Sequence, residues 1–276
     1  MPDPLVSIIL ATRNRAHLIG RAIQSVLDQT FQDWELVVID DASQDKTEGT
    51  IKAWQAKDQR IFYFKNDFQS GIAKSSNKGL NITKGKYIAI IDDDDYWATA
   101  EKLEKQVEFL EKNSDHAGVG GGLILVNKDK KETARVFKTE TDEAIRKRAL
   151  FANPMANSTT VFRKDVAEKI GFYDESFNVA ADWDFWLKLG KIGKLYNFKE
   201  YFTYYLIAED NISFARQKEN FKSGIRIIKK HRLNYPGFKY ALALAYLQYS
   251  YAFLPMSFRQ KANPILSGIK KAVFGL

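Results

Sequence analysis

The 276-residue chain contains no cysteine and only three histidines. Without cysteine, disulfides, iron–sulfur clusters and thiolate zinc sites are excluded. The histidines, His17, His116 and His231, lie far apart and show no helical pairing, so a histidine metal site is not expected. Their default interpretation is a surface or structural role.

Two common nucleotide-binding signatures are also missing. No GxGxxG follows the first predicted strand, and the Walker sequence GxxxxGK[ST] does not occur. The glycine-rich stretch GVGGGLILV, Gly118 to Val126, precedes a strand and does not open a helix, which indicates a β-bulge or a close backbone approach. A Rossmann dehydrogenase or a P-loop enzyme is therefore not expected.

The first ten residues, MPDPLVSIIL, have no basic segment ahead of their short apolar run, which is not the pattern of a signal peptide. We therefore expect a cytoplasmic protein. Its 45% hydrophobic content is ordinary for a folded core, and its length suits one large domain or a domain with an appendage.

The net charge of +8 is concentrated at the C-terminal end. Residues 216–276 hold 12 Lys and Arg and a single acidic residue, Glu219, whereas the first 215 residues carry 30 basic and 33 acidic ones. An uneven charge distribution of this kind indicates a surface that binds a partner and says little about the fold.

The first half of the chain alternates between strand and helix patterns. Continuous apolar and β-branched runs predict buried strands at residues 5–12, 34–43, 60–66 and 85–91. Helical spacing of apolar residues predicts helices at residues 16–29, 45–57, 71–83 and 100–113. This alternation predicts an α/β fold, with a parallel sheet and helices on both of its faces.

Polar segments follow three of these strands: ATRNR, DDAS and DDDD. Ligands of open α/β sheets bind outside the carboxyl ends of the strands, so the three segments are expected to meet at one edge. The run DDDD, Asp92 to Asp95, is by itself most often a solvated turn, although carboxylate oxygens also suit Mg²⁺ or Mn²⁺. The convergence favours a cation site.

Five segments, in order and with fitting spacing, resemble the family 2 glycosyltransferases. They are VSIILATRNR, QSVLDQTFQDWELVVIDDASQDKT, GIAKSSNKGLNITKGKYIAIIDDDD, NSTTVFRKDVAEKIGFYDESF and ADWDFWLKL, and they span roughly Leu5 to Tyr205. The resemblance implies a GT-A fold, with a Rossmann-like and mostly parallel sheet flanked by helices, for residues 1–215. Residues 216–276 are then expected to form a basic, aromatic-rich helical extension.

The resemblance also implies an inverting, metal-dependent enzyme. Such an enzyme moves a sugar from a nucleotide-sugar, expected to be a UDP-sugar, to a hydroxyl of a glycan or lipid-linked saccharide. The family's DxD-like motif places Asp92 and Asp94 where Mn²⁺ or Mg²⁺ is held on the diphosphate, with Asp93 near the diphosphate or sugar. Asp95 is expected to cap the following helix.

Several positions carry over to the nucleotide. Asp41 matches the family's base-binding acid, and Asp40 is expected to orient the ribose or its loop. ATRN replaces the family's usual PTYN, so Arg13 is expected to stack on the base or reach phosphate. Ser76 stands where arginine is frequent, which makes Lys74 the expected basic partner of the aspartates. The implied nucleotide-binding set is Ala11, Thr12, Arg13, Asn14, Asp40, Asp41, Lys74, Asn77, Asp92 and Asp93.

The segment ADWDFWLKL matches the family's EDxDLWLRL, in which the catalytic base corresponds to Asp182, while Ala181 replaces the preceding acid. Inverting transfer needs a base opposite the leaving group to take the acceptor proton. A plain helix cap is the alternative for Asp182, and Asp184 is expected on another face of the helix. The expected acceptor-binding residues are Asn157, Ser158 and Trp183, with a structural turn at 157–158 as the alternative.

The tail segment FKYALALAYLQYSYAFLP places large apolar residues on one helical face: Tyr240, Leu244, Leu247, Tyr251 and Leu254. Polar residues interrupt the run and Pro255 ends it, so a membrane span is not expected. Two interpretations stay open. The helix either lies on an anionic membrane, at the inner face of the plasma membrane, or packs against the catalytic domain.

Two other functions compete with an active transferase. A nucleotide-sugar-binding protein that has lost catalysis would share all of these motifs. A basic nucleic-acid-binding protein would explain the charge of the tail, but interleaved aromatic and basic RNA-binding motifs and a DNA-reading helix are missing. Nucleic acid is therefore not an expected partner.

Overall fold

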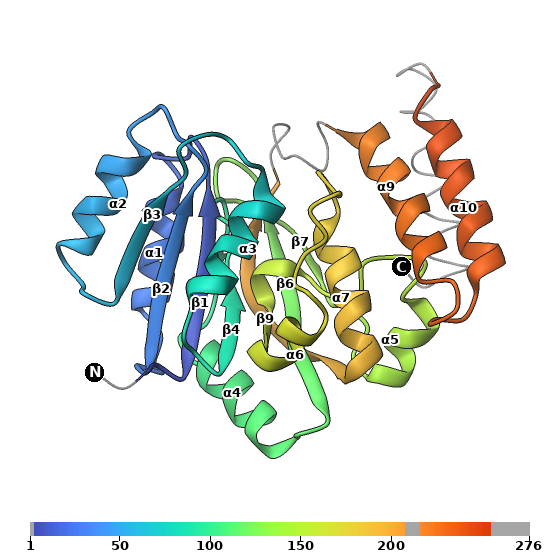
Figure 1. Cartoon of the computed structure of the whole chain (residues 1–276), viewed down its shortest axis with the longest axis horizontal. Helices are drawn as coiled ribbons and strands as arrows, with labels where there is room; N and C mark the ends of the chain where they lie inside the picture. Colours follow the sequence, from blue (N-terminus) through green and yellow to red (C-terminus); the bar gives the residue numbers. More distant parts are fainter. Residues whose placement is uncertain (1–2, 208–215, 255–276) are drawn as a thin grey trace.

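The computed structural model describes residues 3–207 and 216–254 (Figure 1). The described strands are β1 (Val6–Thr12), β2 (Trp34–Asp40), β3 (Ile61–Lys65), β4 (Tyr87–Ile90), β5 (Tyr96–Trp97), β6 (His116–Val126), β7 (Glu132–Val136), β8 (Val161–Arg163) and β9 (Lys194–Leu206). The described helices are α1 (Ile19–Leu27), α2 (Thr47–Gln55), α3 (Ile72–Ile82), α4 (Lys102–Lys112), α5 (Asp142–Arg148), α6 (Lys164–Lys169), α7 (Ala181–Ile192), α9 (Gln217–Lys230) and α10 (Phe238–Tyr251), with the 3-10 turn η1 (Asn157–Thr159).

One nine-stranded sheet runs through the described residues in the order β3-β2-β1-β4-β8-β6-β9-β5, and β7 pairs with β6. The first four strands are parallel, which confirms the prediction from the alternating pattern. Beyond β4 the sheet is mixed, because β8 runs antiparallel to both β4 and β6 and β5 runs antiparallel to β9. Strands as short as β5 and β8 are too short to show a periodicity in the sequence.

The pairing register brings the polar segments to one edge of the sheet. Thr12, at the end of β1, lies opposite Asp40, at the end of β2. Ile9 of β1 lies opposite Ile90 of β4, so the aspartate run leaves the sheet close to these two ends. The predicted convergence of the three segments is therefore confirmed.

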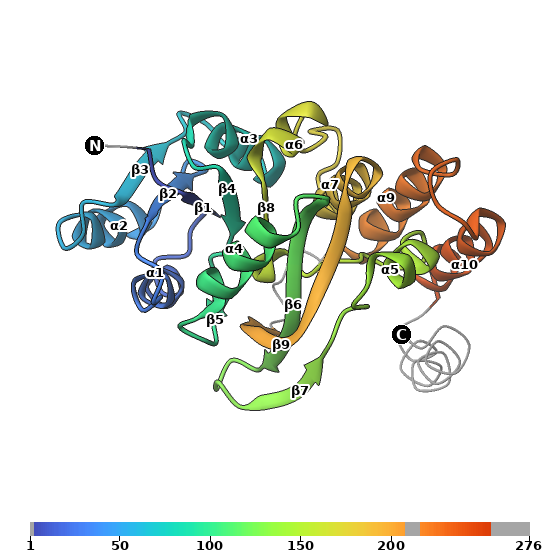
Figure 2. The same ribbon diagram turned by 90° about the horizontal axis from the view of Figure 1, so that it is seen from below.

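Helices cover both faces of the sheet (Figure 2). Helices α1, α2 and α4 share one apolar cluster with side chains of β1, β2 and β4. Helices α3, α5, α6 and α7 share the cluster on the other face, and this second cluster continues into α9 and α10. The two faces carry separate cores because successive side chains of a strand point to opposite sides.

The glycines of β6 allow close backbone approach. A Cβ atom on Gly121 would lie 2.4 Å from the Phe202 ring, and one on Gly120 would lie 2.5 Å from the Asn197 Oδ1 atom. The β6–β9 register shifts around these residues. The glycine-rich stretch therefore forms the irregular strand that its composition predicts.

The C-terminal extension is helical as far as the structure describes it. Ile225, Ile227 and Ile228 of α9 are buried in the cluster that contains α7, so α9 packs against the catalytic part of the chain. Tyr240 and Leu247 on α10 and Leu254 just after it are exposed. None of the described helices has the length and apolarity needed to cross a bilayer. Residues 255–276, which carry the remaining basic residues of the tail, lie outside the described part.

Candidate active site

The aspartate run is held in place by η1. The Asn157 Nδ2 atom donates to the Asp92 Oδ1 atom at 2.9 Å, and the Ser158 Oγ atom lies 3.0 Å from the Asp92 Oδ2 atom. The backbone N–H of Asp92 donates to the same Ser158 hydroxyl at 3.1 Å. Asn157 and Ser158 are expected from the sequence to contact the acceptor. Their hydrogen bonds to Asp92 give both residues a positioning role. Acceptor contact stays a prediction for both.

Asp95 is buried and does not cap a helix, because α4 begins only at Lys102. Its Oδ2 atom lies 2.5 Å from the Ser158 hydroxyl, and its Oδ1 atom accepts from the Leu206 N–H at 3.2 Å. Burial and the charges of Asp94 and Asp92 raise the pKa of Asp95 well above its usual value. A serine hydroxyl has one proton, so a protonated Asp95 can donate to Ser158 while Ser158 donates to Asp92. The expected cap is replaced by this buried relay.

Asp93 faces a cation that the sequence analysis did not identify. The Arg15 Nε atom lies 3.8 Å from the Asp93 Oδ1 atom, and Arg15 follows directly on the ATRN stretch. Burial, with the neighbouring charge of Asp94, raises the pKa of Asp93 to about 7 despite this arginine. Arg15 is therefore a basic partner of the aspartate run, whereas Lys74 is exposed on α3 and its contact with the nucleotide stays a prediction.

The loop after β1 is fastened to the loop after β2. Asn14 has a positive φ of 54°, its N–H donates to the Ser43 Oγ atom at 2.9 Å, and its Oδ1 atom accepts from the Gln44 N–H at 2.8 Å. The Arg15 N–H donates to the Thr47 Oγ1 atom at 3.0 Å. Ala11 and Thr12 are buried at the strand end, which leaves the exposed Arg13 as the side chain of the ATRN stretch most open to a ligand.

Asp40 and Asp41 differ in what they hold. Asp40 is fully buried, accepting from the Ser43 N–H at 2.8 Å and from the Tyr63 hydroxyl at 2.7 Å. Asp41 accepts from the N–H groups of Ser70 and Gly71, at 2.7 Å and 2.9 Å, and its pKa is lowered because these bonds outweigh burial. Both carboxylates therefore shape the loops that border the site.

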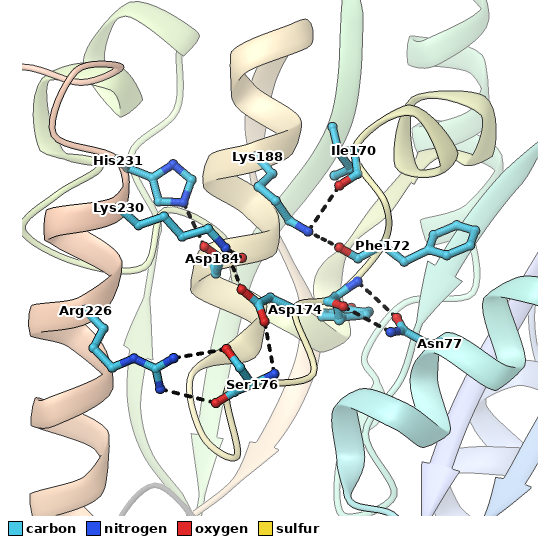
Figure 3. Close-up of polar contacts among 11 residues, drawn as sticks. Asn77, Ile170, Phe172, Asp174, Ser176, Asp184, Lys188, Arg226, Lys230 and His231 are labelled. Carbon is cyan, nitrogen blue, oxygen red and sulfur yellow. Dashed lines mark hydrogen bonds and ion pairs between the residues drawn. The ribbon is translucent and has the colours of Figure 1, made fainter.

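Asn77 is bonded to the segment that precedes α7. Its Nδ2 atom donates to the Tyr173 carbonyl at 3.0 Å and to the Glu175 carboxylate at 2.9 Å, and its Oδ1 atom accepts from the Tyr173 N–H at 3.0 Å (Figure 3). These three bonds tie α3 to the segment before α7. Its expected contact with the nucleotide stays a prediction.

Asp182 lies in the first turn of α7, after Ala180 with its left-handed φ of 59°. Its Oδ2 atom accepts from the Asn153 Nδ2 atom at 2.6 Å, and burial raises its pKa. The charge of Asp182 also contributes to the raised pKa of Asp92, so the two carboxylates share one site. Neighbouring Trp183 donates from its Nε1 atom to the Ala149 carbonyl at 2.9 Å, a structural contact.

Tyr173 is a further residue of this site that the sequence analysis did not single out. Burial raises its pKa well above the usual value, and the charges of Asp182 and Asp92 add to the effect. Tyr173 stands in the segment GFYDE, inside one of the five segments that resemble the family. This place in the sequence is the feature that could have identified it. Tyr173 therefore lies close enough to both aspartates for their charges to affect it.

Comparison with known proteins now identifies the chain. The sequence model of Glycosyl transferase family 2 matches residues 7–171. The chain belongs to this family. A relative from Escherichia coli, UDP-Glc:alpha-D-GlcNAc-diphosphoundecaprenol beta-1,3-glucosyltransferase WfaP, is 31% identical over 83% of this chain and 90% of its own length. A GalNAc(5)-diNAcBac-PP-undecaprenol beta-1,3-glucosyltransferase from Campylobacter jejuni is 29% identical over 79% of this chain and 70% of its own length.

The fold is shared with a solved glycosyltransferase. The mannosyltransferase PcManGT from Pyrobaculum calidifontis, solved with GDP-Man and Mn²⁺, is similar to this chain with a TM-score of 0.67 at 17% sequence identity. The likeness covers 97% of this chain and 81% of that one. The expected GT-A fold is thereby confirmed.

The aspartate run of this family 2 glycosyltransferase fits a divalent ion that is shared with a ligand. Among residues 3–207 and 216–254, no three His, Asp or Glu side chains are grouped to enclose an ion by themselves. The run still offers hard oxygen donors, and its charges raise one another's pKa, a repulsion that a cation would relieve. Mg²⁺ is usually held by one or two carboxylates together with substrate phosphates. The donor set suits that arrangement.

Replacing Asp93 by Asn should stabilise the metal-free protein at alkaline pH. The folded-state pKa of about 7 lies above the usual 3.8, so ionised Asp93 costs stability increasingly as pH rises between these values. We expect Asp93→Asn to gain about 1–3 kcal/mol in the free energy of unfolding at pH 8. Urea unfolding with EDTA at pH 8 and pH 4 measures the gain, which should vanish at pH 4. A gain independent of pH would contradict the repulsion.

Proposed function

We propose that the chain is an inverting glycosyltransferase that moves a sugar from a UDP-sugar to a hydroxyl of a lipid-linked saccharide. The observation that carries this proposal is that Asp92, in the loop after β4, and Asp182, in the first turn of α7, lie close enough for their charges to interact. The names of the Escherichia coli and Campylobacter jejuni relatives support a lipid-linked acceptor, and the former supports UDP-glucose as donor.

Asp182 acts as the general base in this proposal. It takes the proton of the acceptor hydroxyl while the acceptor oxygen bonds to the sugar C1 atom and the bond from C1 to the diphosphate breaks, releasing UDP. Burial raises the pKa of Asp182, which brings its proton affinity closer to that needed near neutral pH. The bond from Asn153 orients the Oδ2 atom of this carboxylate.

Asp92 and Asp94 would hold Mn²⁺ or Mg²⁺ on the diphosphate. When bound, such an ion acts as a Lewis acid that stabilises charge on the leaving diphosphate. Asn157 and Ser158 fix the direction of the Asp92 carboxylate by hydrogen bonds at 2.9 Å and 3.0 Å. Arg15 supplies positive charge beside Asp93, where the phosphates would approach.

The nucleotide would lie along the loops after β1 and β2. Arg13 is exposed there, and a guanidinium can stack on a base or pair with phosphate. Asp41 keeps the segment around Ser70 and Gly71 in place through its two backbone bonds. Screening UDP-sugars and GDP-mannose for thermal stabilisation with Mn²⁺ present distinguishes the donors, since a ligand of the native state raises apparent stability.

Asp182→Asn should lower turnover while leaving donor affinity intact. Asparagine keeps the size and the bond to Asn153 but cannot accept the proton, and general-base contributions are about 10²–10⁴-fold. Transfer from UDP-glucose to GlcNAc-diphosphoundecaprenol measures the loss, and titration calorimetry with UDP measures binding. Asn153→Ala, which frees Asp182 without removing it, should cost less. Near-native transfer by Asp182→Asn would place the base elsewhere. If native protein binds UDP yet transfers nothing, the inactive binding protein is the better description.

Asp94→Ala should remove the metal requirement of UDP binding. The alanine lacks a carboxylate ligand, so Mn²⁺ should no longer strengthen the affinity for UDP, and we expect a loss of about tenfold or more with Mn²⁺ present. Titration calorimetry with and without EDTA measures both quantities. Asp129→Ala, an exposed aspartate in the turn after β6, is the matched control. If Asp94→Ala keeps the same metal-dependent affinity for UDP, the four aspartates form only an acidic turn.

We also propose that the C-terminal extension lies on an anionic membrane surface. Lys218, Lys222 and Lys229 are exposed on α9, and within the described residues no carboxylate pairs with them. The Lys229 Nζ atom bonds the hydroxyl of half-exposed Tyr246 at 2.9 Å, so the basic and aromatic side chains adjoin. We call these four residues the basic–aromatic surface.

Neutralising the basic–aromatic surface should weaken vesicle binding. Each Lys near an anionic surface contributes about 1 kcal/mol, so Lys218, Lys222 and Lys229→Gln together should lower binding to phosphatidylglycerol vesicles by about 100-fold. The matched control changes Lys112, Lys147 and Lys169 to Gln on other elements. Truncation before α9 is a poorer test because it would remove the isoleucines of α9 and expose the part of the core that they cover. If both triple variants bind the vesicles equally in co-sedimentation, the extension only packs against the rest of the chain.

A further inference from the structure

The carboxylate of Asp184 is buried deeply and clamped by the C-terminal helix. The exposed fraction of its side chain is 0%. The Lys230 Nζ atom lies 2.9 Å from the Asp184 Oδ2 atom, and the His231 Nε2 atom lies 2.8 Å from the Asp184 Oδ1 atom. A carboxylate can only accept here, so the imidazole donates from Nε2. Figure 3 shows both groups reaching from the end of α9 to the first turns of α7.

The same end of α9 also holds the segment that precedes α7. Lys230 lies 2.7 Å from the Asp174 Oδ2 atom, so one ammonium joins this segment to Asp184. One turn earlier on α9, the Arg226 guanidinium donates to the Ser176 carbonyl at 3.2 Å and to the Ser176 hydroxyl at 3.0 Å. Residues 174–176 are therefore fixed to α9 by two cations (Figure 3).

A strained turn just before this segment is fixed from α7. Gly171 and Phe172 both have positive φ, at 72° and 56°, and only glycine tolerates such a value without cost. The Lys188 ammonium donates to the Phe172 carbonyl and, at 3.3 Å, to the Ile170 carbonyl. These bonds stabilise a turn that would otherwise relax.

Both ends of this network border the catalytic residues. Asp184 lies two residues after Asp182 in the first turns of α7, so the clamp restricts the rotation and tilt of the turn that carries the base. Tyr173, which lies near Asp182 and Asp92, sits between the strained turn and Asp174. The tail therefore reaches the active site through α7 and through the preceding segment.

Asp184 gives little advantage as a purely stabilising feature. A buried ion pair is often no more stable than apolar residues of similar volume, because both charges lose their hydration. Lys230 and His231 lie 46 and 47 positions further along the chain, so these contacts form only when α9 has docked. What the pair does supply is a fixed direction for α7.

We propose that Asp184 is a positioning residue, and that Lys230 and His231 act through it to aim the Asp182 carboxylate at the acceptor hydroxyl. This inference rests on the proposed function, because it takes Asp182 as the base. Its consequence is that α9 belongs to the catalytic body and also carries the three lysines of the basic–aromatic surface.

Variants of Lys230 and His231 test the proposal without placing an apolar residue at Asp184. Lys230→Met and His231→Leu should each lower kcat for transfer from UDP-glucose to GlcNAc-diphosphoundecaprenol by about tenfold or more, since small misplacement of a reacting group is costly. The KM for UDP-glucose should stay within about twofold, because the donor loops are distant in sequence and unchanged. His231→Gln, whose amide nitrogen replaces the Nε2 donor, should recover most of kcat.

Arg232→Gln is the matched control. Arg232 follows His231 directly, is exposed, and contacts the Lys229 carbonyl at 3.1 Å. It should leave kcat within about twofold of native. If Lys230→Met and His231→Leu also retain native kcat while only the melting temperature falls, the network is structural and the positioning role is wrong.

A second measurement does not need turnover. Hydrogen exchange of the peptide covering residues 181–189 should accelerate in Lys230→Met and His231→Leu and stay native in His231→Gln and Arg232→Gln. Native protein that transfers no sugar would overturn the proposed function, yet this pattern of exchange would still support the clamp. Unchanged exchange in all four variants would overturn the clamp itself.

Discussion

Repulsion among carboxylates is the constraint on which the rest of the site depends. Asp92, Asp93 and Asp95 all have raised pKa values, caused first by burial and then by neighbouring charges. Like charges in a partly buried site are tolerated only when protons, hydrogen-bond donors or cations compensate them. The chain supplies hydrogen-bond donors through Ser158 and Asn157 and a cation through Arg15.

The hydrogen bonds from Asn157 and Ser158 to Asp92 require that η1 be rigid. Buried side chains from three elements hold η1 in place. The Trp97 Nε1 atom and the Thr203 hydroxyl donate to the Ser158 carbonyl at 2.9 Å and 3.0 Å. The Gln106 Nε2 atom donates to the Thr159 carbonyl at 2.8 Å, and Gln106 in turn accepts from the buried Lys102 ammonium. Burial lowers the pKa of Lys102 well below its usual value. The floor of the site is therefore a connected polar network.

The two sides of α9 serve different purposes. Ile225, Ile227 and Ile228 of α9 are buried in the core. The C-terminal end of α9 provides Lys230 and the following His231, which clamp Asp184. Its outward side exposes lysines that contact no carboxylate among the described residues. Under the proposed function, α9 would connect a lipid surface to the turn of α7 that carries Asp182.

The sequence by itself determined the parallel strands, the helices between them and the edge where DDDD meets ATRNR, because these follow from local periodicity and from the rule that ligands bind at strand ends. The resemblance to the family 2 glycosyltransferases also named Asp92 and Asp182, whose charges interact in the folded chain. Only the tertiary structure decided that Arg15 faces Asp93, that Asn157 and Ser158 hold Asp92, and that Asp184 is clamped by Lys230 and His231. Those partners are distant in sequence, and no local pattern records which side chain a folded chain places opposite another.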